Sequence, residues 1–213
     1  MMYLAKTPPL IKPLYRDLDW DGKAGATPVV YLTFDDGPIP EITPWVLEQL
    51  EQYNAKATFF CIGDNVRKHP EVYQQVIASG HTVGNHTFNH LNGWDTPKEE
   101  YLKNIAQCAE LVESKLLRPP YGKITRAQIA ALKTDYRMIM WGVLSADFDQ
   151  KITPKRCLNN VIQNVRNGSI VVFHDSLRAE KNLRYALPHT LEHFHQLGYT
   201  FAALTSAALS KKA

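Results

Sequence analysis

Short, continuous runs of apolar residues alternate along this chain with longer segments in which apolar residues recur at helical spacing. Continuous apolar runs are typical of parallel strands that are covered on both faces. We predict about seven strands from these runs. They cover residues 29–35, 57–62, 82–85, a short strand ending near Arg118, 136–143, 169–174 and 199–204.

The segments between these runs have the pattern of amphipathic helices. Thr43-Pro44 and Thr96-Pro97 each place a capping residue before a proline at the first helical position. Asn167-Gly168 and Leu197-Gly198 are typical of helix ends. The helices predicted in this way cover residues 43–53, 65–79, 97–115, 125–134, 154–167 and 182–197.

Repeated strand–helix units predict the α/β class with a parallel sheet. About seven strands fit an incomplete or distorted (β/α) barrel, smaller than the eight-stranded form of roughly 250 residues. An open doubly wound sheet is the alternative. Residues 1–28 are rich in Pro, Gly and charge, so we expect an N-terminal extension that wraps one domain spanning residues 29–213.

Length, composition and charge exclude several classes of function. At 213 residues, with 45% hydrophobic and 21% charged residues, the chain has the make-up of one well-buried globular domain. The net charge of +3 comes without a Lys/Arg-rich patch interleaved with aromatic residues, which argues against a nucleic-acid partner. No run approaches the ~20 apolar residues of a membrane span.

The first residues do not resemble a targeting segment. Met1 to Pro13 contains three prolines and lacks the apolar core of a secretory signal. We therefore expect a cytoplasmic location. Nothing in the sequence indicates an oligomeric state.

The strand over residues 29–35 ends in two adjacent carboxylates, Asp35 and Asp36, followed by Gly37-Pro38. Ionised aspartates at the tip of a buried strand are unfavourable unless a cation or a substrate meets them. Taken alone, Asp-Asp-Gly-Pro also fits a polar turn.

Two histidines follow about fifty residues on, at His86 and His90. Two imidazoles and one carboxylate suit a borderline divalent metal with a coordination position left open. Taken alone, the pair also fits a surface pair without a ligand. Further polar residues follow later strands, at Arg118, Asp147 and His174. Active sites of parallel α/β folds are built at these carboxyl ends of strands.

Four segments resemble, in order, the motifs of the polysaccharide deacetylases, also called the NodB-homology or carbohydrate esterase family 4 enzymes. The segments are Thr33-Phe34-Asp35-Asp36-Gly37-Pro38, His86-Thr87-Phe88-Asn89-His90, Arg118-Pro119-Pro120-Tyr121-Gly122 and Val172-Phe173-His174-Asp175. The resemblance covers residues 29–205. It implies that the domain is a hydrolase that removes N-acetyl groups from an N-acetylated sugar or polysaccharide.

The resemblance also implies a role for each site residue. Asp36, His86 and His90 match the ligands of one divalent ion, with zinc as the first expectation and cobalt or nickel as alternatives. Asp35 matches the general base, and Arg118 the arginine that pairs with this base. His174 matches the general acid, and Asp147 matches the aspartate that tunes this acid. Tyr121 matches the residue whose backbone N–H holds the oxyanion.

The chemistry of amide hydrolysis fits this set of residues. A Lewis-acidic metal lowers the pKa of bound water and polarises the carbonyl group. Asp35 would take the proton of the water, and His174 would protonate the departing nitrogen. A carboxylate partner raises the pKa of an imidazole. Asp149 and Asp135 compete with Asp147 for this last role.

Two positions depart from the family pattern. Gly142 follows Trp141 where the family often has an acidic or amide residue, and Phe148 follows Asp147 where a tryptophan is common. We expect these changes to affect substrate shape more than activity. Trp94 and Trp141 are candidates for lining a groove.

Two alternatives remain open at this level. The same site could hydrolyse a small-molecule amide or an O-acetyl ester, or the domain could be a carbohydrate-binding protein without activity. A second histidine pair, His189 and His193, has the His-x-x-Glu-His pattern of some zinc proteases. It lies on a predicted terminal helix without an evident third ligand, so we expect a surface pair.

Overall fold

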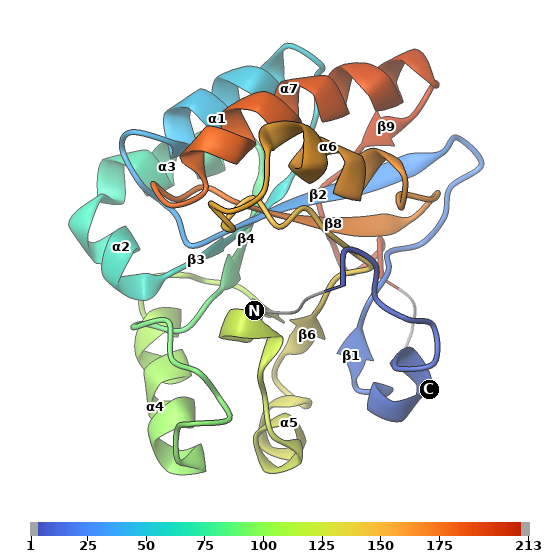
Figure 1. The fold of residues 1–213 in the computed structure, drawn as a ribbon. Helices are drawn as coiled ribbons and strands as arrows, with labels where there is room; N and C mark the ends of the chain where they lie inside the picture. The colour runs from blue at the N-terminus through green and yellow to red at the C-terminus, as the bar shows by residue number, and fades with distance from the viewer. Residues whose placement is uncertain (1–3, 210–213) are drawn as a thin grey trace.

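The computed structural model describes residues 4–209, which form one curled parallel sheet with helices outside it (Figure 1). Within these residues the sheet has nine strands in the order β1-β6-β5-β4-β3-β2-β8-β7, and β9 pairs with β2. The strands are β1 (Leu18–Asp19), β2 (Val29–Asp35), β3 (Thr58–Cys61), β4 (Thr82–Asn85), β5 (Leu116–Leu117), β6 (Arg137–Ile139), β7 (Val143–Leu144), β8 (Ser169–His174) and β9 (Thr200–Phe201).

Seven α-helices and two short 3₁₀ helices connect the strands within the described residues. Figure 1 shows α1, α3 and α7 on one side of β2 and β8, with α4 and α5 on the opposite side of the molecule. The helices are α1 (Thr43–Glu51), α2 (Gly63–Lys68), α3 (Pro70–Ala78), α4 (Lys98–Ala109), α5 (Arg126–Leu132), α6 (Pro154–Ile162), α7 (Glu180–Gln196), η1 (Lys12–Tyr15) and η2 (Pro120–Gly122). The α/β class and the incomplete barrel are therefore confirmed.

The strand predicted over residues 136–143 is two strands, β6 and β7, at opposite ends of the sheet order. The chain changes partners between them. Met140 N–H donates to Asp19 O in β1, whereas Gly142 N–H donates to Ile170 O in β8. A Cβ at Gly142 would lie 2.7 Å from Asp21 Oδ1, so this close approach accounts for the glycine.

The N-terminal segment is part of the sheet. Leu18 and Asp19 pair with β6, and Leu144 N–H donates to Ala5 O at the opposite edge, beside β7. The segment thus connects the two edges of the curled sheet. Together with the division of 136–143, β1 raises the strand count above the predicted seven.

Several predicted helix boundaries were wrong. The helix predicted over 65–79 is two helices that meet at Pro70, because proline cannot donate the backbone hydrogen bond that would continue the first. Thr43 and Thr96 do not cap helices: Thr43 Oγ1 binds Asp175, and Thr96 Oγ1 donates to Asn92 O. Gly198 follows α7 with φ +76°, as a helix end predicts.

Side chains alternate between the two faces of β2, and this alternation positions the site. Val30, Leu32 and Phe34 pack under the helices in the largest apolar cluster. Residues 29 and 31 pack inside the curl with apolar residues of other strands. Since side chains repeat every second residue, Thr33 and Asp35 also face the interior.

Within residues 4–209, no helix combines the length and apolar character that a bilayer span requires.

Candidate active site

Asp35 lies at the end of β2 and binds an arginine inside the barrel. Asp35 Oδ1 accepts a hydrogen bond from Arg118 Nη1 at 2.7 Å. The same nitrogen donates to Thr33 Oγ1 at 2.7 Å. Arg118 Nε and Nη2 donate to the carbonyl oxygens of Ile139 and Met140 at 3.1 and 3.0 Å. The guanidinium is therefore fixed by β2 and by the chain that leaves β6.

This ion pair is sealed from solvent. Arg118 is 0% exposed and Asp35 is 3% exposed. The guanidinium lies 4.2 Å from the centre of the Phe60 ring. Burial lowers the pKa of Arg118, whereas the contact with Asp35 raises it. Separating such a buried pair costs about 3–5 kcal/mol, so each charge fixes the other in place.

Asp36 follows Asp35 but turns into a different environment. Its backbone has φ +82°, a left-handed conformation that is uncommon for residues other than glycine. Asn65 Nδ2 donates to Asp36 O at 2.7 Å, and Gly37 N–H donates to Asp175 Oδ1 at 3.1 Å. A Cβ at Gly37 would lie 1.9 Å from Asp175 Oδ2, so only glycine fits there. Contacts on both sides thus hold Asp36 in its strained conformation.

Two histidines face the side chain of Asp36. His86 Nε2 lies 3.7 Å and His90 Nε2 lies 3.2 Å from Asp36 Oδ1. His86 Nδ1 is 2.8 Å from the Arg118 carbonyl oxygen. A carbonyl only accepts, so Nδ1 carries the proton and Nε2 presents its lone pair to Asp36.

The second histidine is oriented by a tyrosine. His90 Nδ1 lies 3.1 Å from Tyr121 Oη, and the two rings meet edge to face at 4.6 Å. A proton on Nδ1 that donates to this oxygen leaves the Nε2 lone pair directed at Asp36. Both His90 and Tyr121 have positive φ, at +57° and +61°.

The donor set fits a divalent cation. Ligand atoms of Asp36, His86 and His90 lie within 4.8 Å of one another, and Asp36 Oδ1 is buried without a hydrogen-bond partner. Burial lowers the pKa of His86 to about 4, so this imidazole is neutral near pH 7. Burial raises the pKa of Asp36, but the three imidazoles around it, those of His90, His174 and His86, lower it more. An ionised Asp36 and a neutral His86 are in the protonation states that metal binding requires.

His174 lies at the end of β8 and is held by Asp147. Asp147 Oδ1 is 2.7 Å from His174 Nδ1, and Asp147 Oδ2 accepts the His174 backbone N–H at 2.7 Å. Asp147 is 0% exposed, and the Phe148 ring meets the imidazole edge to face at 5.2 Å. Burial alone would lower the pKa of His174, but the charge and hydrogen bond of Asp147, with Asp36 and Asp35, raise it to about 10.

The competing aspartates have other positions. Asp149 Oδ1 accepts the Lys151 backbone N–H at 3.0 Å, and Asp135 follows the end of α5. The carboxylate that contacts His174 is therefore Asp147.

These groups converge on one cavity of about 460 Å³. Arg118 and Asp147 lie behind its wall, fully buried. The remaining six predicted site residues line it: Asp35, Asp36, His86, His90, Tyr121 and His174. Trp141, Leu144, Phe148 and Val172 form an apolar wall, and Lys123 and Arg178 complete the lining. Trp94 is 62% exposed and does not line this cavity.

Sequence reasoning missed several residues that support the site. Thr33 Oγ1 accepts a hydrogen bond from Arg118 and donates one to Val171 O at 2.7 Å. In the sequence, a lone polar residue inside an apolar strand could have indicated this role. Asn65 and Asp175 hold the Asp36 loop from elements far away in sequence, and Tyr121 acts through its hydroxyl group. No spacing along the chain indicates these three contacts.

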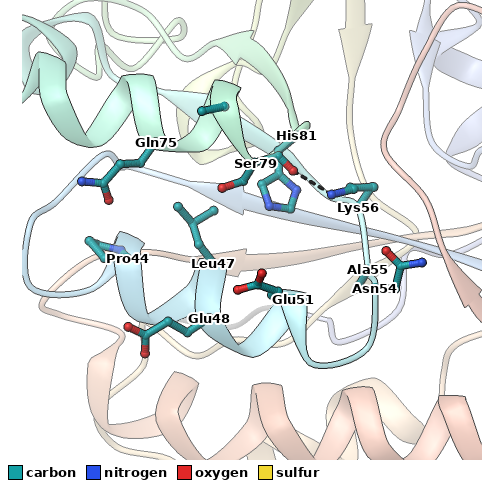
Figure 2. Close-up of a pocket in the computed structure, with 11 residues that line it drawn as sticks. Pro44, Leu47, Glu48, Glu51, Asn54, Ala55, Lys56, Gln75, Ser79 and His81 are labelled. Carbon is teal, nitrogen blue, oxygen red and sulfur yellow. Dashed lines mark hydrogen bonds between the residues drawn. The ribbon is translucent and has the colours of Figure 1, made fainter.

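A larger hollow, of about 620 Å³, lies between α1 and α3 (Figure 2). Its lining residues Lys56 and His81 lie within two residues of the starts of β3 and β4, so the hollow lies at the amino ends of the strands, away from the site above. His81 Nδ1 accepts the Ala57 N–H at 3.2 Å, and burial lowers the pKa of His81 to about 4. These features indicate a structural histidine.

The second histidine pair does not form a metal site. Among the described residues, Asp36, His86 and His90 are the only group of three side chains placed to hold a metal ion. His189 Nδ1 lies 2.7 Å from Tyr185 O within α7. His189 is exposed, as expected for a surface pair.

Comparisons with known proteins agree with this geometry. The family described as polysaccharide deacetylase matches residues 22–139. A peptidoglycan-N-acetylglucosamine deacetylase of Bacillus cereus is 34% identical over 185 residues, covering 83% of this chain and 86% of that protein. A second protein of the same name from this organism is 36% identical over 154 residues, and the aligned part covers 69% of this chain but 56% of that protein.

One further relative and one solved structure extend the comparison. A chitooligosaccharide deacetylase of Azorhizobium caulinodans is 35% identical over 154 residues, covering 68% of this chain and 73% of that protein. The crystal structure of a peptidoglycan N-acetylglucosamine deacetylase in complex with 4-naphthalen-1-yl-N-oxidanyl-benzamide superposes with a TM-score of 0.85 at 29% identity. That match covers 97% of this chain and 99% of the other.

Proposed function

Because this chain belongs to the polysaccharide deacetylase family, we propose that it is a metal-dependent hydrolase that removes N-acetyl groups from an N-acetylated sugar or polysaccharide. One observation carries the proposal. Three groups line one cavity: Asp35, which is held by a buried arginine, Asp36, which faces two imidazoles, and His174, which is held by a buried carboxylate.

Asp36, His86 and His90 would hold the metal ion. One oxygen and two nitrogen donors suit zinc, and they also accept cobalt or nickel. When bound, the ion supplies Lewis-acid chemistry, which polarises a carbonyl group and makes water more acidic.

Asp35 acts as the general base. Its carboxylate lines the cavity and is held by Arg118, and a carboxylate in this position can accept a proton from water. Three further hydrogen bonds fix the guanidinium of Arg118. The fixed guanidinium in turn holds Asp35 Oδ1 in one orientation.

His174 acts as the general acid. Asp147 occupies its Nδ1, so Nε2 remains to deliver a proton to the departing nitrogen. The raised pKa of His174, about 10, keeps this imidazole protonated near neutral pH. An amine leaves only after protonation, so an acid that is protonated at neutral pH favours amide over ester substrates. The backbone N–H of Tyr121, beside the cavity, supports the oxyanion.

The names of the relatives suggest the substrate class. Those proteins are peptidoglycan and chitooligosaccharide deacetylases, and we extend the N-acetylated glycan to this chain as the proposed substrate.

Acetate release tests the proposal. The protein is stripped with a chelator, reloaded with zinc and assayed on chitin oligosaccharides, peptidoglycan and acetylated xylan. We expect activity only in the metal-loaded form, and its loss in Asp35→Asn. A metal-loaded protein that releases no acetate from any N-acetylated glycan would contradict the proposal.

A further inference from the structure

Two cations line the candidate cavity without a role in the proposed reaction. Lys123 comes from the loop after β5, two residues beyond Tyr121, and Arg178 from the loop after β8, four residues beyond His174. The two therefore approach the cavity from different loops.

No carboxylate among the described residues neutralises either cation. Within residues 4–209, the ion pairs join other partners, and no carboxylate pairs with Lys123 or Arg178. Arg178 Nε donates to Phe148 O at 3.1 Å, which anchors the side chain on the apolar wall. An anchored but unpaired guanidinium suits a planar anionic group of a ligand.

The two carboxylates that line the cavity already have partners within the protein. Asp35 pairs with Arg118, and Asp36 faces the two imidazoles. His174 is likewise paired, with the Asp147 carboxylate, so it adds no uncompensated charge. Among the described residues, the cations of the lining that have no carboxylate partner are therefore Lys123 and Arg178, and a positive cleft favours anionic ligands.

An aromatic ring lies beside one of the cavity cations. Lys123 Nζ lies 5.3 Å from the centre of the Trp94 ring, and the indole is anchored by a hydrogen bond from Nε1 to Ile124 O at 3.2 Å. Trp94 remains 62% exposed. An exposed indole next to an ammonium group suits a sugar ring that carries an acidic substituent.

We propose that the site takes N-acetylated glycans that carry an anionic group, a carboxylate or a phosphate, close to the reacting sugar, and that Arg178 and Lys123 bind this group. The inference rests on the proposed deacetylase function and narrows its substrate class.

Three probes with one backbone test the inference: neutral chitin oligosaccharides, 6-O-carboxymethyl chitin oligosaccharides and 6-O-phosphorylated chitin oligosaccharides. Dissociation constants and kcat/KM are measured on the zinc-loaded protein at low and high salt. We expect at least one acidic probe to be preferred over the neutral one, with the preference reduced at high salt because salt screens partly exposed charges. The two acidic probes distinguish a carboxylate from a phosphate.

Variants then assign the preference. In Arg178→Gln and in Lys123→Gln the acidic-to-neutral ratio should fall about fivefold, as for one close, partly exposed ion pair. Arg178→Lys should keep most of the preference. Arg16→Gln and Lys103→Gln are exposed controls away from the cavity and should leave the ratio within about twofold.

Equal binding of all three probes, or an unchanged ratio in both Gln variants, would overturn the inference. The dissociation constants do not depend on turnover, so the preference for acidic probes can be judged separately from the deacetylase activity. A protein that prefers acidic probes but releases no acetate would contradict the deacetylase proposal and still support the anionic ligand.

Discussion

Asp35 and Asp36 are adjacent in the chain, yet the pleat of β2 and the turn that follows give them different partners. Asp35 meets Arg118 inside the barrel, and Asp36 meets His86 and His90. Single substitutions at these positions should therefore have different consequences.

Asp35→Asn should leave the metal bound and lower kcat by about 10² or more, the scale of losing a general base. Asp36→Asn should lose the metal, because an amide is a weaker ligand than a carboxylate. Metal analysis after dialysis, beside kcat on one acetylated substrate, checks both. His86→Ala and His90→Ala should match Asp36→Asn in metal content. Equal metal content in all four variants would refute this division of roles.

The pair of Asp147 and His174 should set the alkaline limb of the pH–rate profile. His174 acts only while protonated, so activity persists below its pKa, which the structure raises to about 10. Asp147→Asn removes the charge that raises this pKa, so the limb should move to lower pH by about one unit or more. The profile of kcat/KM against pH measures the shift. His174→Ala should lose most of the rate with metal retained, and an unmoved limb in Asp147→Asn would exclude Asp147 as the tuning group.

The hydroxyl of Tyr121 should strengthen metal binding through His90. Removing a group that orients a metal ligand lowers affinity by about tenfold or more. Tyr121→Phe should therefore raise the zinc dissociation constant, measured by competition with a chromogenic chelator. Tyr185→Phe is a matched control, because the ring of Tyr185 also contacts a histidine, His189, away from the cavity. Equal zinc affinity in Tyr121→Phe and the control would contradict this role.

At the scale of elements, Asp175 connects the end of β8 to the start of α1 and to the loop of Asp36. Its carboxylate accepts hydrogen bonds from Gly37 N–H and from Thr43 Oγ1, at 3.1 and 2.6 Å. The side chain is 1% exposed, and burial raises the pKa of Asp175 from 3.8 to about 8. This carboxyl group is therefore protonated more readily in the folded than in the unfolded protein.

Because the pKa of Asp175 is raised on folding, this group makes the folded protein less stable as pH rises. The stabilisation is complete below pH 3.8 and is lost as pH rises towards about 8, because only the unfolded chain releases the proton early. Asp175→Asn does not titrate; its amide oxygen can still accept from Gly37 N–H, while the hydrogen bond with Thr43 would have to reverse, with the amide donating to Thr43 Oγ1. Its stability relative to wild type should therefore increase from pH 5 to pH 8, measured by urea unfolding of the metal-free protein. A constant difference over this range would show that Asp175 does not titrate there.

At the scale of the whole molecule, the N-terminal segment holds the curled sheet together. Arg137 Nε and Nη2 donate to the two oxygens of Asp19 at 2.9 and 2.7 Å, which ties β1 to β6. Asp19→Ala should lower the free energy of unfolding by about 1–3 kcal/mol, as expected for the loss of two charge-assisted hydrogen bonds at a partly buried site. Glu180→Ala, which breaks an exposed pair with Arg184, should cost less than about 1 kcal/mol. Equal losses in urea unfolding would refute a special role for β1.

The pattern of the chain determined the α/β class, the long strands and the positions of the site residues. Parallel strands present their carboxyl ends at one edge, so polar residues that follow separate strands meet in space. Asp35, His86 and His174 could therefore be assigned to one site from strand positions alone. Local chemistry also determined the helix end at Gly198, where a left-handed residue is required.

Contacts between segments distant in sequence were decided only by the tertiary structure. Three features depend on which segments lie side by side after the sheet curls. They are the division of residues 136–143 into two strands, the strand formed by the N-terminal segment and the position of the cations at the cavity. Thr43 shows the same effect, because a buried carboxylate 132 residues away competes successfully for the hydroxyl expected to cap α1. The physical reason is that a pattern of apolar and polar residues fixes which face of an element is buried, but not which partner it meets there.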